Sequence, residues 1–92
     1  MIKYLSRGQV TVEELRNLYQ SVGWTSYTQD LTILAKTLEG SRHYIIARTE
    51  GRLVGLVRSV GDGVFIAYIQ DLLVHPDYHR QGIGTQLMEQ VF

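Results

Sequence analysis

The segment from Val64 to Gly84 most constrains the fold, because an apolar strand, a sharp stop and a glycine-opened helix follow one another in it. Residues 64–74 are apolar at most positions, and only Gln70 and Asp71 interrupt them. Such a run is typical of a strand covered on both faces, so we expect it to be the central strand of a sheet. Pro76, the only proline in the sequence, ends this strand.

The rest of the chain alternates between the apolar period of a helix and that of a strand. Thr11 and Glu14 have the spacing of a capping box, and an apolar stripe follows them up to Gly23. Residues 50–52 form a tight turn, because Gly51 adopts a positive φ at little cost. The expected elements are strands at residues 2–5, 43–48, 53–60 and 64–74, and helices at residues 11–22, 28–39 and 82–92.

This order, β-α-α-β-β-β-α, predicts an α/β (α+β) fold with a mixed, mainly antiparallel sheet flanked by helices. The 92 residues contain no internal repeat, low-complexity run or linker. We therefore expect a single domain over residues 1–92.

Composition excludes several classes of function. Nine basic and nine acidic residues give a formal net charge of zero, so no field attracts nucleic acid or an anionic membrane. The absence of cysteine excludes disulfides, a thiol nucleophile and thiolate metal sites. The N-terminus lacks the apolar core of a signal peptide, and no window approaches the roughly 20 apolar residues that span a bilayer. We expect a soluble, cytoplasmic protein that binds neither nucleic acid nor membrane.

The loop after the apolar strand is the segment best suited to bind a ligand. Residues 82–84, Gly-Ile-Gly, open the last helix, where the first backbone N–H groups lack intrahelical acceptors and the helix dipole is positive. The turn therefore suits a pyrophosphate, and Arg80 adds a charge-assisted contact. The third glycine of the dinucleotide fingerprint and the Gly-Lys-Ser/Thr of the P-loop are both absent. The alternative is a plain helix start whose glycines only allow tight packing.

Residues 74–88, Val-His-Pro-Asp-Tyr-His-Arg-Gln-Gly-Ile-Gly-Thr-Gln-Leu-Met, resemble the acetyl-CoA signature of the GNAT superfamily of N-acetyltransferases. That signature is Gln/Arg-x-x-Gly-x-Gly/Ala at the start of the helix after the fourth strand. Residues 69–74 resemble that strand, and the order of elements matches the first half of the family fold. The resemblance implies acetyl-CoA as the cofactor and direct transfer of its acetyl group to a small-molecule or peptide amine.

The resemblance also implies which residues bind the cofactor. His79 occupies the Gln/Arg position of the signature, and a neutral histidine donates more weakly to phosphate. The residues whose backbone N–H groups are implied to hold the pyrophosphate are Gln81, Gly82, Ile83, Gly84 and Thr85. The residues whose backbone is implied to bind the pantetheine arm are Leu72, Leu73 and Val74.

Gln70 and Asp71 are polar residues inside the apolar strand, and neighbours in a strand point to opposite faces. One reading makes Asp71 a catalytic group that helps to deprotonate or bind an amine acceptor, with Gln70 beside it. The other reading makes Asp71 a hydrogen-bonded polar residue at a bulge or near the strand end. The sequence leaves both open.

Trp24 and Tyr27 lie between the first two helices, where the resembled family has a border of its acceptor site. Aromatic walls suit amine substrates, so both residues are candidates for substrate binding. The alternative is ordinary packing of large aromatic side chains against the core, which we favour slightly for Trp24 and strongly for Tyr27.

Two other groups of residues offer weaker signals. His75, Asp77 and His79 alternate along the loop, but a zinc site needs three or four converging ligands, so we predict no metal. The arginines of the second and third strands, Arg48, Arg52 and Arg58, are predicted to form a solvated face of the sheet.

The sequence stops at Phe92 inside an apolar helical pattern, whereas the resembled family continues through another strand, a helix and a hairpin. That part commonly supplies a tyrosine general acid, which matches no residue here. Two hypotheses follow: a GNAT-type acetyltransferase, and a non-catalytic module that binds coenzyme A weakly or only self-associates. We also expect a homodimer or an exchange of elements that covers the apolar edge of residues 64–74.

Overall fold

The computed structural model describes residues 1–24, 34, 36, 38–41, 43–61 and 67–91. Its elements, in chain order, are β1 (Lys3–Ser6), α1 (Val12–Ser21), β2 (His43–Thr49), β3 (Arg52–Gly61), β4 (Ala67–Val74), a short 3-10 helix (Pro76–Tyr78) and α3 (Ile83–Val91). Each of the strands and α-helices confirms a predicted element within a few residues, whereas the 3-10 helix was not predicted. The second predicted helix is helical at Leu34, Lys36, Leu38 and Glu39. Its predicted start at Thr28 lies outside the described residues.

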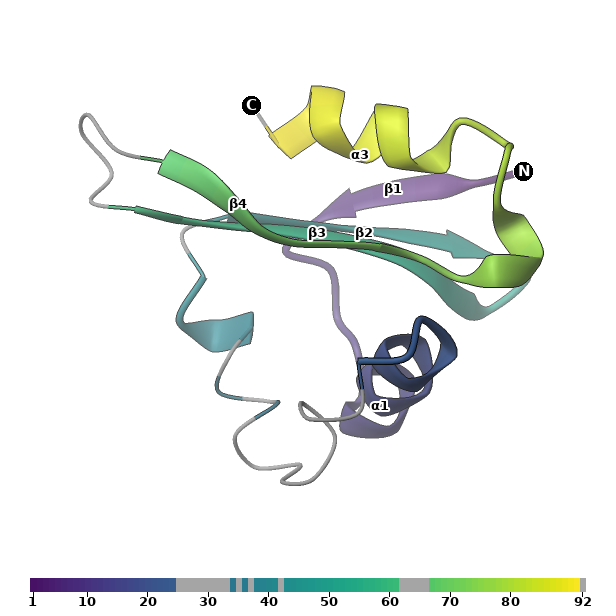
Figure 1. Cartoon of the computed structure of the whole chain (residues 1–92), viewed down its shortest axis with the longest axis horizontal. Coiled ribbons are helices and arrows are strands. Elements are labelled where there is room, and N and C mark those ends of the chain that lie inside the picture. The colour runs from purple at the N-terminus through teal and green to yellow at the C-terminus, as the bar shows by residue number, and fades with distance from the viewer. Residues whose placement is uncertain (25–33, 35, 37, 42, 62–66, 92) are drawn as a thin grey trace.

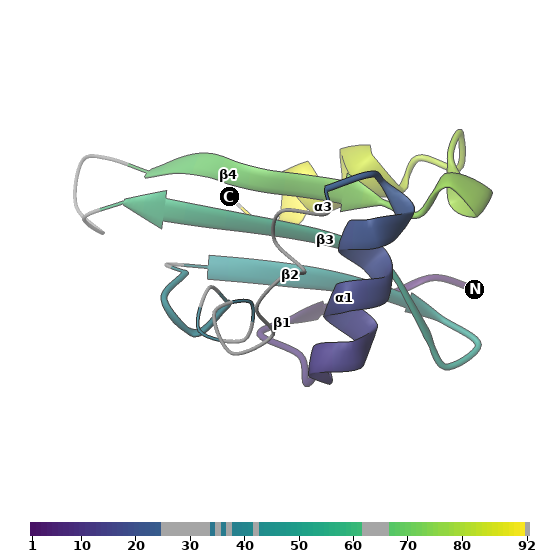
Figure 2. The same cartoon turned by 60° about the horizontal axis from the view of Figure 1, so that its bottom comes forward.

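The four described strands form one sheet in the order β1-β2-β3-β4, and each pairing between them is antiparallel (Figures 1 and 2). This confirms the predicted α+β class. β4 lies at one edge of this sheet, so the expectation of a central strand is wrong for the described part of the chain. The apolar run of β4 reflects cover on its two faces, and cover on the faces does not require pairing at both edges.

The two described helices cover opposite faces of the sheet, as Figure 1 shows. On one face, Leu15, Leu18 and Tyr19 of α1 pack with Leu56 and Leu73 of the sheet. On the other face, the buried residues of α3 pack with buried residues of β2 and β3: Ile83, Leu87 and Val91 with Ile45, Ala47, Val54 and Val57. Neither helix is long and apolar enough to cross a bilayer in the part of the chain that is described.

Local signals in the sequence explain the ends of these elements. The predicted capping box of α1 is present, with Thr11 Oγ1 accepting from the Glu14 N–H and Glu14 Oε1 accepting from the Thr11 N–H. Gly51 has φ +78° in the turn between β2 and β3, as expected for a glycine in the left-handed region. Both predictions are therefore confirmed.

α3 packs closely over Gly55 of β3. A Cβ atom at this position would lie 3.1 Å from Ile83 Cγ2, 3.1 Å from Leu87 Cδ1 and 3.3 Å from Ala47 Cβ. We therefore expect Gly55→Val to push α3 outward and to lower the free energy of unfolding by about 1–3 kcal/mol, measured by urea denaturation.

The matched control is Gly84→Ala, because a Cβ at Gly84 meets only Val74 Cγ2 at 3.8 Å. The control is expected to unfold at the same urea concentration as the wild type or slightly above it. Equal midpoints for Gly55→Val and the wild type would contradict close packing at Gly55.

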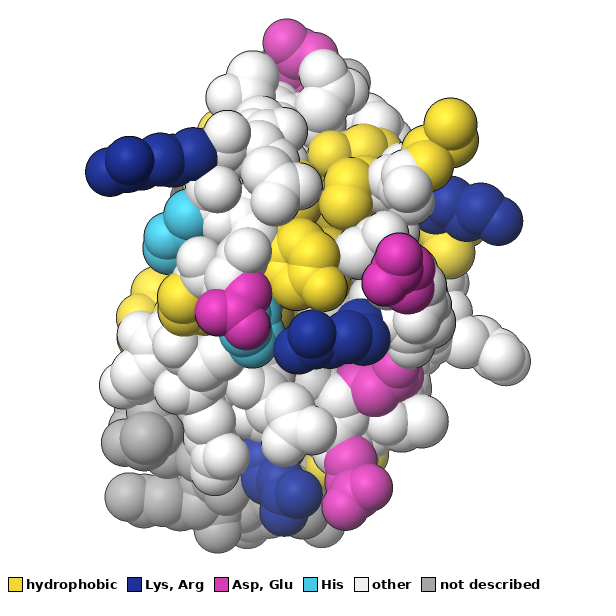
Figure 3. Space-filling view, turned by 90° about the vertical axis from the view of Figure 1, so that its right-hand side faces the viewer, with side chains coloured by type: hydrophobic (Ala, Val, Ile, Leu, Met, Phe, Trp, Pro, Cys, Tyr) yellow, Lys and Arg dark blue, Asp and Glu magenta, His cyan; other side chains and the backbone are white. Residues whose placement is uncertain are grey.

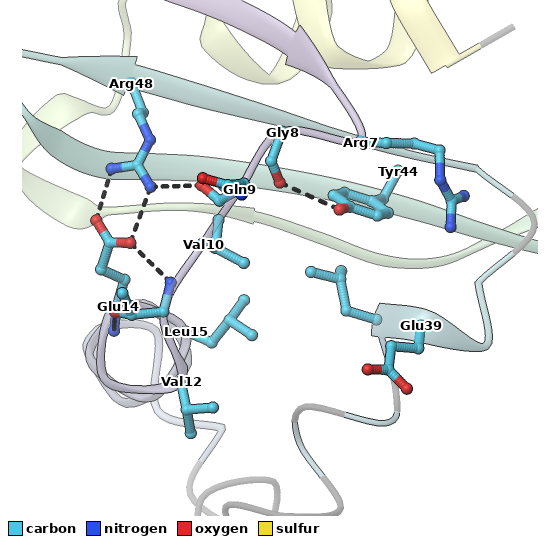
Figure 4. A pocket seen from close by; sticks show the side chains of 12 residues that line it. Arg7, Gly8, Gln9, Val10, Val12, Glu14, Leu15, Glu39, Tyr44 and Arg48 are labelled. Carbon is cyan, nitrogen blue, oxygen red and sulfur yellow. Dashed lines mark hydrogen bonds and ion pairs between the residues drawn. The ribbon is translucent and has the colours of Figure 1, made fainter.

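On the α1 side of the sheet, a cavity of about 550 Å³ lies between the β1–α1 connection, α1 and β2 (Figure 4). Arg48 closes one end of it by donating from Nη1 to Glu14 Oε2 at 2.5 Å, and from Nη2 to Glu14 Oε1 and the Gln9 carbonyl, each at 2.8 Å. Tyr44 Oη donates to the Gly8 carbonyl at 3.1 Å. The side chains of Arg48, Glu14 and Tyr44 at this cavity therefore bond to each other or to the backbone.

The ion pair between Arg48 and Glu14 leads us to expect that the fold is less stable in acid. The hydrogen bond from Arg48 is the largest of the effects that lower the pKa of Glu14 from 4.5 to about 2. A lowered pKa stabilises the fold fully above pH 4.5, and this contribution is lost as the pH falls toward 2. Because 27% of the Glu14 side chain is exposed, solvent screens the pair. We expect Glu14→Gln to cost about 1 kcal/mol at pH 7 and nothing near pH 2, by urea denaturation at both pH values.

The control for this prediction is Glu13→Gln, since Glu13 is an exposed residue of the same helical turn that contacts only Arg16, at 3.5 Å, among the described ion pairs. It is expected to change stability by less than about 0.5 kcal/mol at either pH. A loss in Glu14→Gln that is equal at pH 7 and pH 2 would show that the ion pair is not its source.

Candidate active site

The loop between β4 and α3 is braced by its own histidines and backbone. His75 donates its backbone N–H to the Val54 carbonyl at 2.8 Å, which ties the loop to β3. His75 Nδ1 accepts from the Asp77 N–H at 3.1 Å, and His79 Nε2 lies 2.8 Å from the Val74 carbonyl. These three contacts brace the loop between β4 and α3.

The helix after this loop begins with the geometry of an anion site. Gly82 has φ +77° and Arg80 has φ +65°, so the chain turns sharply just before α3. The Gly82 carbonyl accepts from the Gln86 N–H at 3.0 Å, which makes Gly82 the residue that precedes the first turn. The next three N–H groups, those of Ile83, Gly84 and Thr85, have no intrahelical acceptor in an α-helix. Together with the dipole of α3, they favour a bound anion at this end of the helix.

At the start of α3, one side chain is buried and anchors the helix to the core, whereas its neighbours are exposed to solvent. Ile83 is buried in the core between α3 and the sheet, which fixes the position of its backbone. Arg80, Gln81, Gly82 and Thr85 are exposed. Figure 3 shows this end of the molecule, where hydrophobic side chains gather and basic, acidic and histidine side chains surround them. An anion can therefore reach the backbone of the turn and the guanidinium of Arg80.

A groove of about 570 Å³ runs beside the helix start. Its lining combines a residue of β4 with residues of α3: Leu72, Gly84, Thr85, Met88 and Glu89. The structure thus brings together three of the residues predicted for the cofactor, one from the strand and two from the helix. The groove is mostly apolar at Leu72 and Met88, which suits an uncharged aliphatic chain with a few amides.

The three strand residues predicted for the pantetheine arm differ in exposure. Leu73 is buried in the core on the α1 side, whereas 38% of Leu72 is exposed. β4 is an edge strand of the described sheet, so its outer side presents backbone N–H and C=O groups that an extended ligand can pair with. The Val74 carbonyl is already hydrogen-bonded to His79 Nε2, so it is not free to pair with a ligand.

Asp71 lies in the interior rather than in a cleft. Its side chain is 2% exposed and accepts two hydrogen bonds on Oδ2, from Tyr19 Oη at 2.9 Å and from Arg58 Nε at 2.5 Å. Arg58 is 7% exposed, and its Nη1 is 3.4 Å from Ser41 Oγ. The prediction that Arg58 belongs to a solvated face is therefore wrong, because the counter-charge of Asp71 allows it to be buried.

The pKa values reflect this burial. Burial first, and then the negative charge of Asp71, raise the pKa of Tyr19. Burial on its own lowers the pKa of Arg58, but the hydrogen bond and the charge of Asp71 outweigh it, so the pKa of Arg58 is raised. Both groups therefore stay protonated at neutral pH, and each donates a hydrogen bond to Asp71.

A β-bulge lies directly beside this ion pair. Arg58 is paired with Asp71 across the two strands, whereas the next residue, Ser59, is paired with Ile69, so Gln70 is the extra residue. The Gln70 side chain is exposed. These contacts favour the second reading of Asp71, a hydrogen-bonded polar residue at a bulge. The catalytic role stays an untested prediction.

Of the two predicted aromatic residues, Trp24 follows α1 and Tyr27 lies outside the described residues. The Trp24 N–H donates to the Tyr19 carbonyl at 3.0 Å, and the centroids of the two rings are 6.0 Å apart. Trp24 is 36% exposed. It therefore combines an accessible ring with a fixed place beside the Tyr19–Asp71 contact.

The loop histidines are used in local structure, as described above. Within the described ranges, no group of three or more histidine, cysteine, aspartate or glutamate side chains lies close enough to hold a metal ion.

Solved structures that are named acetyltransferases or probable acetyltransferases are similar to this chain in fold and in sequence. The protein SP0256 from Streptococcus pneumoniae TIGR4, a GNAT family acetyltransferase, superposes with a TM-score of 0.82 at 40% identity, over 98% of this chain and 64% of that one. The probable acetyltransferase SA2161 from Staphylococcus aureus superposes with a TM-score of 0.87 at 25% identity, over 99% of this chain and 66% of that one. The chain thus shares its fold with acetyltransferases.

The family model named acetyltransferase (GNAT) family matches residues 10–92, and the chain belongs to that family. Among curated relatives, histone acetyltransferase TAP1 from Glycine max is 37% identical over 98% of this chain, and GCN5-related N-acetyltransferase 2, chloroplastic, from Arabidopsis thaliana is 30% identical over 98%. The chain spans 43% and 42% of the length of these two relatives.

Proposed function

We propose that this chain binds acetyl-CoA at the turn before α3 and supports transfer of the acetyl group to an amine acceptor. The observation that carries the proposal is the left-handed turn at Gly82, which exposes the first N–H groups of α3 beside the groove along β4. An anion at the helix start and an extended chain along an edge strand match the pyrophosphate and the pantetheine arm of coenzyme A. Two acetyltransferases with the same fold were solved in complexes that contain coenzyme A or a coenzyme A conjugate.

The proposed pose places the reacting group by simple geometry. The pyrophosphate lies on the backbone of residues 81–85, with Arg80 as a further donor; His79 donates to it from Nδ1 only when its ring is protonated, because Nε2–H is bonded to the Val74 carbonyl. The pantetheine arm follows Leu72, Leu73 and Val74, and three extended residues span about 10 Å. The thioester then lies near the bulge at Gln70, where the ladder of strand hydrogen bonds is interrupted and backbone groups are available.

The proposed reaction is a direct displacement. The amine nitrogen forms a bond to the acetyl carbonyl carbon, the bond from that carbon to the coenzyme A sulfur breaks, and the amine loses a proton as the thiol is released. Positioning of the two reactants and polarisation of the thioester carbonyl are the contributions that a fixed backbone supplies. Trp24 and Gln70 are the described residues that we place at the acceptor side.

Calorimetry with coenzyme A tests the cofactor site. We expect micromolar to millimolar binding by the 92-residue chain, with competition by acetyl-CoA. The absence of heat at millimolar coenzyme A would overturn the proposal. Binding without acetyl transfer to kanamycin, spermidine or a lysine-containing peptide would favour the alternative, a module that binds coenzyme A without turnover.

We further infer that, when coenzyme A is not bound along it, the outer edge of β4 pairs with a second copy of the chain, as a homodimer or by exchange of elements; coenzyme A and the second copy compete for the same backbone groups. Support comes from the edge position of β4 and from the exposure of Leu72 on it. Light scattering at micromolar concentration tests this inference, and a monomer would overturn it. Cytoplasmic location likewise stays a prediction, to be checked by cell fractionation.

A further inference from the structure

We propose that Asp71 is a positioning residue, which holds Tyr19 and Arg58 so that the bulge at Gln70 and the ring of Trp24 keep fixed places at the acceptor side. This inference rests on the proposed function, because it assigns a role in the same site. The buried network of Tyr19, Arg58 and Asp71, with Ser41 at its end, joins α1, β3, β4 and the residue that follows the second helix.

The network fixes the register of β4. Arg58 and Asp71 are direct partners across the β3–β4 pair, and the register shift falls between Arg58 and Ser59, one step from the ion pair. A slip of one residue along β4 would carry the Asp71 carboxylate to the opposite face of the sheet and leave Arg58 buried without its counter-charge. The ion pair therefore determines that Gln70, and no neighbour of it, forms the bulge.

The same carboxylate fixes the aromatic wall. Tyr19 is 1% exposed, its hydroxyl is bonded to Asp71 and its ring packs on Trp24. The backbone of Trp24 is also bonded to the Tyr19 carbonyl. Any movement of the Tyr19 ring is therefore passed to Trp24, so the strand that carries the bulge and the exposed aromatic ring move together.

Burial separates this role from proton transfer. An acceptor amine cannot reach a carboxylate that is 2% exposed, and the two donors on Asp71 Oδ2 keep their protons. A catalytic base needs to contact the proton that it removes, directly or through one water molecule. Asp71 acts instead through the residues that it holds.

The test uses Tyr19→Phe and the double variant Arg58→Met/Asp71→Leu, each in the full chain. Tyr19→Phe removes one hydroxyl and leaves the ion pair, whereas the double variant replaces the pair by apolar side chains of similar volume. The control is Tyr44→Phe, which removes a hydroxyl that is bonded to the Gly8 carbonyl near β1. Three readouts are measured. The first is the fluorescence anisotropy of Trp24, which is the only tryptophan in the sequence, and the second is the amide hydrogen exchange of residues 69–72. The third is steady-state kinetics with acetyl-CoA and an amine, which is kanamycin, spermidine or a lysine-containing peptide.

We expect both network variants to lower the Trp24 anisotropy, and we expect the double variant, which lacks the ion pair, also to raise exchange at residues 69–72 at least about 5-fold; Tyr44→Phe is expected to change neither. The KM for the amine is expected to rise about 10-fold in Tyr19→Phe, with the KM for acetyl-CoA unchanged. The acid limb of the pH–rate profile is expected to remain in the double variant, because the proposal gives Asp71 no proton to transfer.

Three results would overturn the proposal. One is native anisotropy and exchange in both network variants. Another is a double variant that keeps the native Trp24 anisotropy but loses the acid limb of the pH–rate profile and about 1,000-fold in kcat. That result would make Asp71 a catalytic base. The third is the same change in Tyr44→Phe as in Tyr19→Phe. If the wild type did not bind coenzyme A, the proposed function would be overturned but the role of the network would not, since anisotropy and exchange report on the network without substrate.

Discussion

Gly84→Val is expected to weaken coenzyme A binding by about 100-fold, or about 2.7 kcal/mol, without loss of stability. The Cβ of a residue at this position has only Val74 Cγ2 nearby, at 3.8 Å, so the fold accepts a side chain there. The two methyl groups of valine would instead enter the groove at the start of α3 and keep the pyrophosphate away from the backbone N–H groups. Calorimetry with coenzyme A, together with thermal unfolding of the free protein, measures both effects.

Gly84→Ala is the control, because the resembled signature allows alanine at this position and a single methyl fills less of the groove. It is expected to bind within about 5-fold of the wild type, which is about 1 kcal/mol. Equal affinities for Gly84→Val and Gly84→Ala would show that the ligand does not approach the backbone at this turn, and the proposed site would be lost.

Asp71→Leu is expected to lower the free energy of unfolding by about 3–5 kcal/mol, the second large effect. The substitution leaves the guanidinium of Arg58 buried without its partner, and an unpaired buried charge is far more costly than a missing pair. A domain of this size has a free energy of unfolding of about 5–10 kcal/mol, so the variant is expected to be largely unfolded at modest temperatures. Circular dichroism during urea denaturation measures the loss.

The double variant Arg58→Met/Asp71→Leu is the matched comparison, and it is expected to recover stability to within about 1–2 kcal/mol of the wild type. Tyr19 keeps its ring packing in this variant but loses its acceptor, which accounts for the remaining loss. A double variant as unstable as Asp71→Leu would mean that the network stabilises the fold in itself, and that packing alone cannot replace it.

Local patterns predicted most of the fold. The spacing of Thr11 and Glu14 located the start of α1, and Gly51 located the turn between β2 and β3, because caps and turns depend on a few neighbouring residues. The turn at Gly82 was predicted in the same way, from a strand, a stop and a helix that adjoin in the chain. The anion site is therefore the part of the candidate site that the sequence describes best.

The ion pair between Arg58 and Asp71 was missed because it depends on cross-strand register. The two residues are 13 positions apart and meet only if Gln70 forms a bulge, which no local pattern specifies. A signal was present: Arg58 follows the apolar residues 53–57, and an arginine in such a strand requires a buried counter-charge. Asp71 was the one acidic residue of the next strand.

The expectation that residues 64–74 form a central strand was wrong for a different reason, although an unpaired edge of this strand was expected. Apolar residues on both sides of a strand report that both faces are covered, and α1 and α3 provide that cover. The number of strands that pair with it depends on the topology of the sheet, and the apolar pattern of one strand does not report that topology.

The order of the strands in the described sheet has a consequence for how the chain assembles. β2, β3 and β4 follow one another through short connections, so these three strands can form as successive hairpins with little cost of closing long loops, whereas β1 pairs with β2 across residues 7–42. α3 packs on β2 and β3 and follows them in the chain, so its docking surface is synthesised before it emerges. We expect the anion-binding turn to take shape after these strands have paired, as α3 settles over Gly55.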